Sequence, residues 1–237
     1  PKGSAAERLE NIRAEGAEAC ITDLNYDGAV RLANRQAQEK GWVMVQDTAW
    51  EGYEDIPQWI MQGYGTMGYE AYTQLPEKPT HIFLQAGVGS MAGAVAGFFA
   101  EVYGKDRPII TIVEPDKADC IFRTAKAADG RLHFVTGDMD TIMAGLACGE
   151  PCSIGWNVLK DYADYFISCP DYRAAKGMRI LGNPAAGDSR VIAGESGPAA
   201  SGCVSENLRK PRYAQIKERL KLNKTSRALF FNTEGDT

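Results

Sequence analysis

The sequence predicts an α/β fold in which a parallel sheet is flanked by helices. Short, nearly all-apolar segments such as HIFLQAG (81–87) and PIITIVEP (108–115) are typical of strands that are covered on both faces. A segment of helical length, rich in small residues, lies between these two strands. Strands that alternate with helices in this way indicate parallel pairing with crossover helices.

At the N-terminal end, the sequence predicts a helix over residues 4–15. Ser4 and Glu7 have the spacing of a capping box, and Gly16 is the expected terminator. A short strand is expected next, at residues 17–23. These elements open the alternating pattern.

A second helix is expected over residues 27–40. Asn25 or Asp27 would cap its first turn, and Gly41 would close it. The nearly all-apolar segment WVMVQD (42–47) then predicts a buried strand.

A polar, charge-rich connection over residues 48–57 is the best candidate for a domain hinge. Pro57 fits the first turn of a helix, which residues 59–75 would continue. Further helices are expected at 90–104, 116–128, 139–147, 153–176, 195–208 and 211–221. Further short strands are expected at 133–137 and 226–233.

Composition and charge exclude several classes of function. The net charge is −5, whereas nucleic-acid-binding domains usually carry a basic stripe, so we expect no nucleic-acid partner. No apolar run reaches the roughly 18 residues that a membrane span needs, and the N-terminal segment lacks the apolar centre of a signal peptide. We therefore expect a cytoplasmic protein that contacts no membrane.

The six cysteines are expected to be free thiols in a reducing compartment. Cys148 and Cys152 are the only close pair, and a C-x₃-C spacing without nearby histidines is a poor zinc site, so no metal is expected. A bridge from Cys120 to Cys148 or Cys152 remains an alternative that the sequence does not decide.

The turn after the strand HIFLQ predicts an anion site. It contains Gly87 and Gly89, and Ser90 begins the following helix. Backbone amides at a helix start have no internal partner and carry the positive end of the helix dipole. Glycine lets an anion approach without a Cβ clash, and the Ser90 hydroxyl adds a possible donor. Phosphate is the natural ligand.

The spacing of the residues that follow the glycines indicates which phosphate-bearing ligands the turn could bind. A nucleoside triphosphate is disfavoured because no lysine follows the glycines. A nicotinamide cofactor is an alternative, since Glu114 ends the next strand, but Gly93 is one residue too far for the dinucleotide pattern. Close packing of helix on strand without any ligand is the other alternative.

The glycine turn also carries a resemblance to a known family. QAGVGSMAGAVAGFFAEVYG, followed by PIITIVEPDKADC, resembles the phosphate loop of fold type II pyridoxal-phosphate enzymes, the tryptophan synthase β-like fold. More narrowly, the chain resembles the 2,3-diaminopropionate ammonia-lyases, and the matching stretches run through it in order. These stretches are PKGSAAERLENIRAEGAE, VQDTAWEGYEDIPQWIMQGYGTM, HFVTGDMDTIMAGLACGEP, AGESGPAASG and FFNTEGDT.

The resemblance implies pyridoxal 5'-phosphate as cofactor. In that family a lysine that forms a Schiff base with the cofactor lies upstream of the PKGS segment, as does an Asp-Gly-Asn-His stretch. We therefore expect this chain to be a piece of a longer protein. Residues 1–47 would be the remainder of a smaller domain, and residues 48–237 would form the larger, cofactor-binding domain.

The resemblance also assigns candidate site residues. Asp47 matches an active-site aspartate that takes the Cα proton of one substrate enantiomer, and an adjacent Trp50 would raise its pKa by desolvation. Thr233 would hydrogen-bond the pyridine nitrogen. A helix cap or turn is the alternative for Asp47, and a strand-end turn for Thr233. The residues expected to hold the phosphate are Gly87, Val88, Gly89, Ser90 and Met91.

The implied reaction is α,β-elimination of 2,3-diaminopropionate, an amino-acid substrate, to pyruvate and ammonia. The resemblance also implies a homodimer. Two alternatives stay open: a threonine or serine dehydratase-like enzyme of the same fold, and a catalytically incomplete piece that only folds or binds phosphate.

Overall fold

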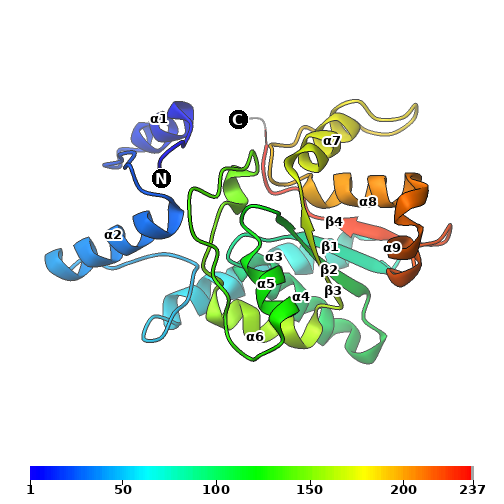
Figure 1. Ribbon diagram of the computed structural model, residues 1–237, viewed down its shortest axis with the longest axis horizontal. Helices are drawn as coiled ribbons and strands as arrows, with labels where there is room; N and C mark the ends of the chain where they lie inside the picture. Colours follow the sequence, from blue (N-terminus) through cyan, green and yellow to red (C-terminus); the bar gives the residue numbers. More distant parts are fainter. Residues whose placement is uncertain (236–237) are drawn as a thin grey trace.

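One parallel sheet organises the computed structural model, which describes residues 1–235. Its strand order is β3-β2-β1-β4, and every neighbouring pair is parallel (Figure 1). The strands are β1 (His81–Gln85), β2 (Ile109–Pro115), β3 (Tyr165–Cys169) and β4 (Ala228–Phe230). The α/β fold class with a parallel sheet is therefore confirmed.

Both faces of the sheet are buried, as the unbroken apolar strands predict. Ile82 and Leu84 of β1 pack into one hydrophobic cluster, together with residues of α4 (Ser90–Tyr103). Phe83, which points to the opposite face, packs into a second cluster with residues of α8 (Ala199–Arg209). Burial on both faces explains why the strands show no alternation of polar and apolar residues.

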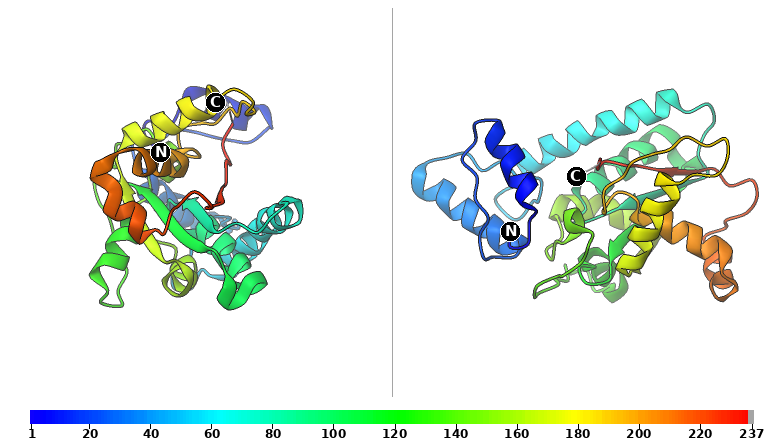
Figure 2. Two further views of the ribbon diagram at one scale, coloured as in Figure 1. Left: turned by 90° about the vertical axis from the view of Figure 1, so that its right-hand side faces the viewer. Right: turned by 90° about the horizontal axis from the view of Figure 1, so that it is seen from above.

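The helices from α3 to α9 form one layer on each face of the sheet (Figures 1 and 2). The layer with α4 contains α3 (Asp55–Gln74), α5 (Cys120–Ala127) and α6 (Ser153–Tyr162). The layer with α8 contains α7 (Asp171–Gly182) and α9 (Ala214–Arg219). Short 3₁₀ turns lie at Gly104–Asp106, Ala144–Leu146 and Pro211–Tyr213. No helix within residues 1–235 combines the length and the apolar character that crossing a bilayer requires.

The two N-terminal helices, α1 (Ala6–Ala14) and α2 (Tyr26–Lys40), lie to one side of the sheet (Figures 1 and 2). The predicted cap of α2 is confirmed, since the Asn25 side chain accepts a hydrogen bond from the Gly28 amide. The predicted capping box of α1 is wrong. The Ser4 hydroxyl instead donates to the carbonyl of Pro1, because α1 starts one residue later than a Ser4 cap requires.

Three predicted strands are absent from the described residues. Segments 17–23, 42–47 and 133–137 contain no strand, although their residues favour extended backbone. A strand needs a neighbour that satisfies its backbone donors and acceptors, and these segments have none in the sheet. Part of the second segment is instead held by the Tyr53 hydroxyl, which accepts from the Gln46 amide.

Two predicted helices also differ from the structure. Residues 153–176 form α6, β3 and the start of α7 in place of one helix. Tyr165, Phe166 and Ile167 favour a strand, and Pro170 disfavours helix at the preceding residue, so the signal was present in the sequence. Residues 139–147 contain only a short 3₁₀ turn.

Glycines set the spacing within both helical layers. A Cβ on Gly93 of α4 would lie 3.0 Å from the carbonyl oxygen of Gly155 in α6. In the other layer, a Cβ on Gly202 of α8 would lie 1.9 Å from the carbonyl oxygen of Arg173 in α7. The helix backbones therefore leave no room for a side chain at Gly202, and only tight space for one at Gly93.

Replacing Gly202 tests this packing. We expect Gly202→Ala to lower the free energy of unfolding by about 1–3 kcal/mol, because α7 and α8 must move apart. Gly63→Ala on α3 is the matched control, since a Cβ there meets nothing within 4 Å. We expect that variant to be more stable by about 0.5–1 kcal/mol. Urea unfolding measures both, and equal effects would contradict the packing argument.

Candidate active site

A cavity of about 310 Å³ opens at the carboxyl end of β1, where parallel α/β sheets place their ligands. It lies between the turn that joins β1 to α4, the segment before α3 and the C-terminal segment. Every site residue expected from the sequence lines it. These residues are Asp47, Gly87, Val88, Gly89, Ser90, Met91 and Thr233. The last two residues of the FFNTEGDT stretch, Asp236 and Thr237, lie outside the described residues.

The turn requires glycine at position 89 and leaves only tight space for a side chain at position 87. Gly89 has a φ of 96°, which side chains rarely adopt, and a Cβ there would lie 2.7 Å from Cδ1 of Ile121. A Cβ on Gly87 would lie 3.0 Å from the sulfur of Cys148. Neighbouring side chains therefore pack directly against the backbone of the turn.

The turn presents backbone donors to the cavity. Ser90 and Met91 are the first two residues of α4, and the N–H groups of a helix's first turn have no partner within the helix. They also carry the positive end of the helix dipole. This end of the cavity can therefore bind an anionic group such as phosphate through its main chain.

The Ser90 side chain has a different role from the one expected. Its hydroxyl donates to the main-chain carbonyl of Asp47 at 2.6 Å, so it does not point at a ligand as an additional donor. The sulfur of Cys152 donates to the same carbonyl at 3.6 Å. These bonds fix the Asp47 backbone beside the glycine turn.

The Asp47 carboxylate faces the cavity and is half-buried. Burial raises its pKa, and the Tyr64 hydroxyl, which donates to Oδ2 at 3.1 Å, acts in the opposite direction. Trp50, from which the sequence analysis expects desolvation, stacks on Tyr53 with ring centroids 4.4 Å apart and lines a second cavity.

Thr233 lies near a buried amide that the sequence reasoning missed. The Gln85 Nε2 group donates to the carbonyl of Phe231 at 2.9 Å and to the Thr233 hydroxyl at 3.4 Å. Its Oε1 atom is buried and has no partner among the described residues. A polar residue at the end of an otherwise apolar strand was the available signal.

An ion pair joins the N-terminal helix to the edge of the cavity. Arg8 of α1 contacts Glu234, which lines the cavity, at 2.8 Å and Glu195 at 3.0 Å. Glu234 also accepts from the Ser196 amide at 2.7 Å. Nothing in the local sequence around Arg8 indicates this contact, because the partners lie far along the chain.

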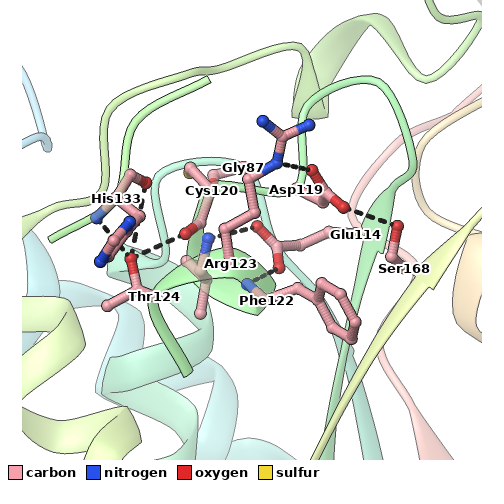
Figure 3. A network of polar contacts seen from close by, with 10 residues as sticks. Gly87, Glu114, Asp119, Cys120, Phe122, Arg123, Thr124, His133 and Ser168 are labelled. Carbon is pink, nitrogen blue, oxygen red and sulfur yellow. Dashed lines mark hydrogen bonds and ion pairs between the residues drawn. The ribbon is translucent and has the colours of Figure 1, made fainter. Parts of the chain in front are cut away.

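A buried glutamate, Glu114, fixes the helix start that packs against the glycine turn (Figure 3). Glu114, at the end of β2, accepts from the amides of Ile121 and Phe122 at 2.9 and 2.6 Å, and so fixes the start of α5. Ile121 in turn packs against Gly89. Burial raises the pKa of Glu114 to about 8, despite these two amide donors.

Comparison with known proteins identifies the class that this fold and glycine turn define. The family model described as "Pyridoxal-phosphate dependent enzyme" matches residues 1–215, and the chain belongs to that family. Within it, the chain is similar to the diaminopropionate ammonia-lyase of Salmonella typhimurium, with 54% identity over 242 residues that cover 100% of this chain and 60% of the relative. The chain thus spans about three fifths of that relative's length.

Solved structures agree with this similarity. The holo form of Escherichia coli diaminopropionate ammonia-lyase is 51% identical with a TM-score of 0.92, and covers 100% of this chain and 59% of its own. The same enzyme in complex with D-serine is 49% identical with a TM-score of 0.92 and the same coverage. The resemblance found in the sequence is therefore confirmed.

The raised pKa of Glu114 predicts a pH-dependent stability. A glutamate in the unfolded chain ionises near pH 4.5, whereas this one ionises near pH 8 when folded. Its contribution to the free energy of unfolding is therefore fully present below pH 4.5 and is lost progressively as the pH rises from 4.5 to about 8. Between these values we expect a loss of up to about 1.4 kcal/mol per pH unit from this group.

Urea unfolding between about pH 5 and pH 8 measures this slope. We expect Glu114→Gln to flatten it, because the amide does not titrate. Glu218→Gln, which changes an exposed glutamate on α9, is the matched control and should keep the wild-type slope. An unchanged slope in Glu114→Gln would show that Glu114 does not titrate differently on folding.

Proposed function

We propose that the protein containing this chain is a pyridoxal-phosphate-dependent ammonia-lyase that converts 2,3-diaminopropionate to pyruvate and ammonia by α,β-elimination. The observation that carries the proposal is that the Asp47 carboxylate and the anion-binding turn 87–91 line one cavity. Similarity to diaminopropionate ammonia-lyases over the whole chain supports the choice of substrate. A relative that binds D-serine supports an amino-acid ligand.

The residues present fit pyridoxal phosphate. The turn at Gly87 and Gly89 leaves little room for side chains, and its amides suit the phosphate. Thr233, at the opposite end of the chain, lines the same cavity and would bond the pyridine nitrogen. The unpartnered Oε1 atom of Gln85 is a further polar group in this cavity.

The cofactor, when bound, withdraws electrons from the substrate Cα and thereby acidifies the Cα–H bond. The protein residues supply position and proton transfer. The turn 87–91 would hold the phosphate, and the neutral Thr233 hydroxyl would face the pyridine nitrogen without adding a charge there. The Asp47 carboxylate takes the Cα proton of one enantiomer, and its raised pKa brings it closer to the value that a general base needs near neutral pH.

One observation indicates that the 237 residues alone bind the cofactor but do not catalyse the elimination. Among the described residues that line the cavity there is no lysine. We propose that the lysine which attaches the cofactor comes from the part of the relatives' length that this chain does not match. The chain alone would then bind pyridoxal phosphate without catalysing elimination.

We also propose the finer features that the resemblance implies. Residues 1–47 would belong to a smaller domain, and the exposure of the apolar side chains of Trp42, Val43 and Val45 supports this division. A cytoplasmic location is supported by the free state of all six cysteines. The proposal that the protein is a homodimer depends on the resemblance alone, and analytical ultracentrifugation would test it.

Removing the carboxylate tests the assigned base. We expect Asp47→Asn in the complete holoenzyme to lower kcat/KM for one enantiomer of 2,3-diaminopropionate by about 10²–10⁴-fold, because the general base is lost. The other enantiomer should lose less. Pyruvate formation measures both rates.

Asp138→Asn is the control for this experiment, since Asp138 is exposed and does not line the cavity. Wild-type turnover of both enantiomers by Asp47→Asn would overturn the assignment. A preference for serine or threonine over diaminopropionate would support a dehydratase instead.

The chain alone gives a second test. We expect it to bind pyridoxal phosphate with the spectrum of the free aldehyde and to form no pyruvate. Gly89→Ala should bind about tenfold more weakly, because alanine is strained at a φ of 96° and clashes with Ile121. Equilibrium dialysis measures the affinity. A visible band of lysine-bound cofactor, together with pyruvate, would show that a lysine of this chain suffices.

A further inference from the structure

We propose that Tyr64 is a positioning residue for the Asp47 carboxylate. The Tyr64 hydroxyl holds one carboxylate oxygen and keeps the group ionised, while the other oxygen faces the substrate. This inference rests on the proposed function, because it concerns the base of that reaction. Nothing in the motif around Asp47 points to Tyr64, which lies 17 residues further along the chain on α3.

The geometry fixes Asp47 at three points. Its amide donates to the side-chain oxygen of Gln46 at 2.6 Å, and its carbonyl accepts from the Ser90 hydroxyl at 2.6 Å. The third point is the bond from the Tyr64 hydroxyl to Oδ2 at 3.1 Å. The first two bonds fix the main chain, and only the third orients the carboxylate. Within residues 1–235, no other side chain donates to this group.

Tyr64 is well placed for this role. It lines the same cavity as Asp47, and its helix packs along α4, whose first turn forms the anion site. The hydroxyl is thus mounted on a regular helix and not on a loop. A donor held in this way keeps its direction when a ligand enters, which is what orienting a base requires.

The two groups also balance each other electrostatically. Burial raises the pKa of Asp47, and the hydrogen bond from Tyr64 lowers it. Burial and the neighbouring carboxylate raise the pKa of Tyr64 to about 12, so the phenol keeps its proton across any neutral assay. Loss of the hydroxyl would therefore remove the larger of the two hydrogen bonds that oppose the effect of burial on the Asp47 pKa.

Three other ionisable groups near Asp47 keep their protons at neutral pH. Tyr26 of α2, Tyr53 before α3 and Cys148 before α6 each have a pKa raised by burial. Glu234 also lines the cavity but is paired with Arg8 of α1. Since Glu114 behind the glycine turn has a pKa of about 8, the pH profile is paired with a direct titration of Asp47.

Tyr64→Phe tests the proposal in the complete holoenzyme. For the enantiomer that depends on Asp47, we expect the acid limb of kcat/KM to move up by about one pH unit, because Asp47 becomes harder to ionise. Tyr69→Phe is the matched control, since Tyr69 is an exposed tyrosine on the same helix. It should leave the profile unchanged.

A second readout needs no turnover. In the chain labelled with ¹³C-aspartate, the carboxyl resonance that disappears in Asp47→Asn reports the pKa of Asp47. We expect this pKa to rise by about one unit in Tyr64→Phe and to stay unchanged in Tyr69→Phe. Should Tyr64→Phe fail to fold, 3-fluorotyrosine, a stronger donor of nearly the same shape, should lower the pKa of Asp47.

The outcomes separate this inference from the function on which it rests. If Asp47→Asn keeps full turnover of both enantiomers, the base assignment fails. If Asp47→Asn loses turnover while Tyr64→Phe keeps the wild-type pH profile and Asp47 titration, the base stands and the role of Tyr64 is overturned. An Asp47 pKa that does not respond to 3-fluorotyrosine would also overturn it.

Discussion

The close approach of side chains to the backbone at Gly89 is the constraint on which the site depends. A Cβ on residue 89 would lie 2.7 Å from Cδ1 of Ile121, and the first turn of α4 begins at the next residue. Because residue 89 carries no side chain, the turn can adopt the conformation in which its amides lie at the cavity, where they can bind a phosphate. The position of Ile121 depends on Glu114, which holds the start of α5 against the end of β2.

The same turn also fixes the position of the proposed base, Asp47. Ser90 ties the Asp47 backbone to the start of α4, so the proposed base and the anion site belong to one rigid unit. Tyr64 reaches this unit from α3, and Gln85 of β1 reaches Thr233 at the other end of the cavity. Elements of regular structure thus hold both ends of the cavity, which is how a site can keep its geometry while its ligands change.

Much of this could be predicted from the sequence, because the signals are local. The apolar runs at β1 and β2, the glycines between them and the Asn25 cap each act over a few residues. The predictions failed where the outcome depends on partners. Segments 17–23 and 42–47 favour extended backbone but have no neighbour in the sheet. The strand Tyr165–Cys169 was missed for a different reason, since its own residues favour a strand but were included in a longer predicted helix.

The sequence by itself determined that a strand, a glycine turn and a small-residue helix would follow one another, since adjacent residues build them through their own backbone, and it predicted an anion site at that turn. It also marked Asp47 and Thr233 through family resemblance. Only the tertiary structure decided what surrounds them. The Ser90 hydroxyl donates to the Asp47 carbonyl, the Tyr64 hydroxyl donates to the Asp47 carboxylate, and Arg8 reaches Glu234 across 226 positions. Such contacts join residues that no local pattern relates, and they exist only once the sheet has brought their elements together.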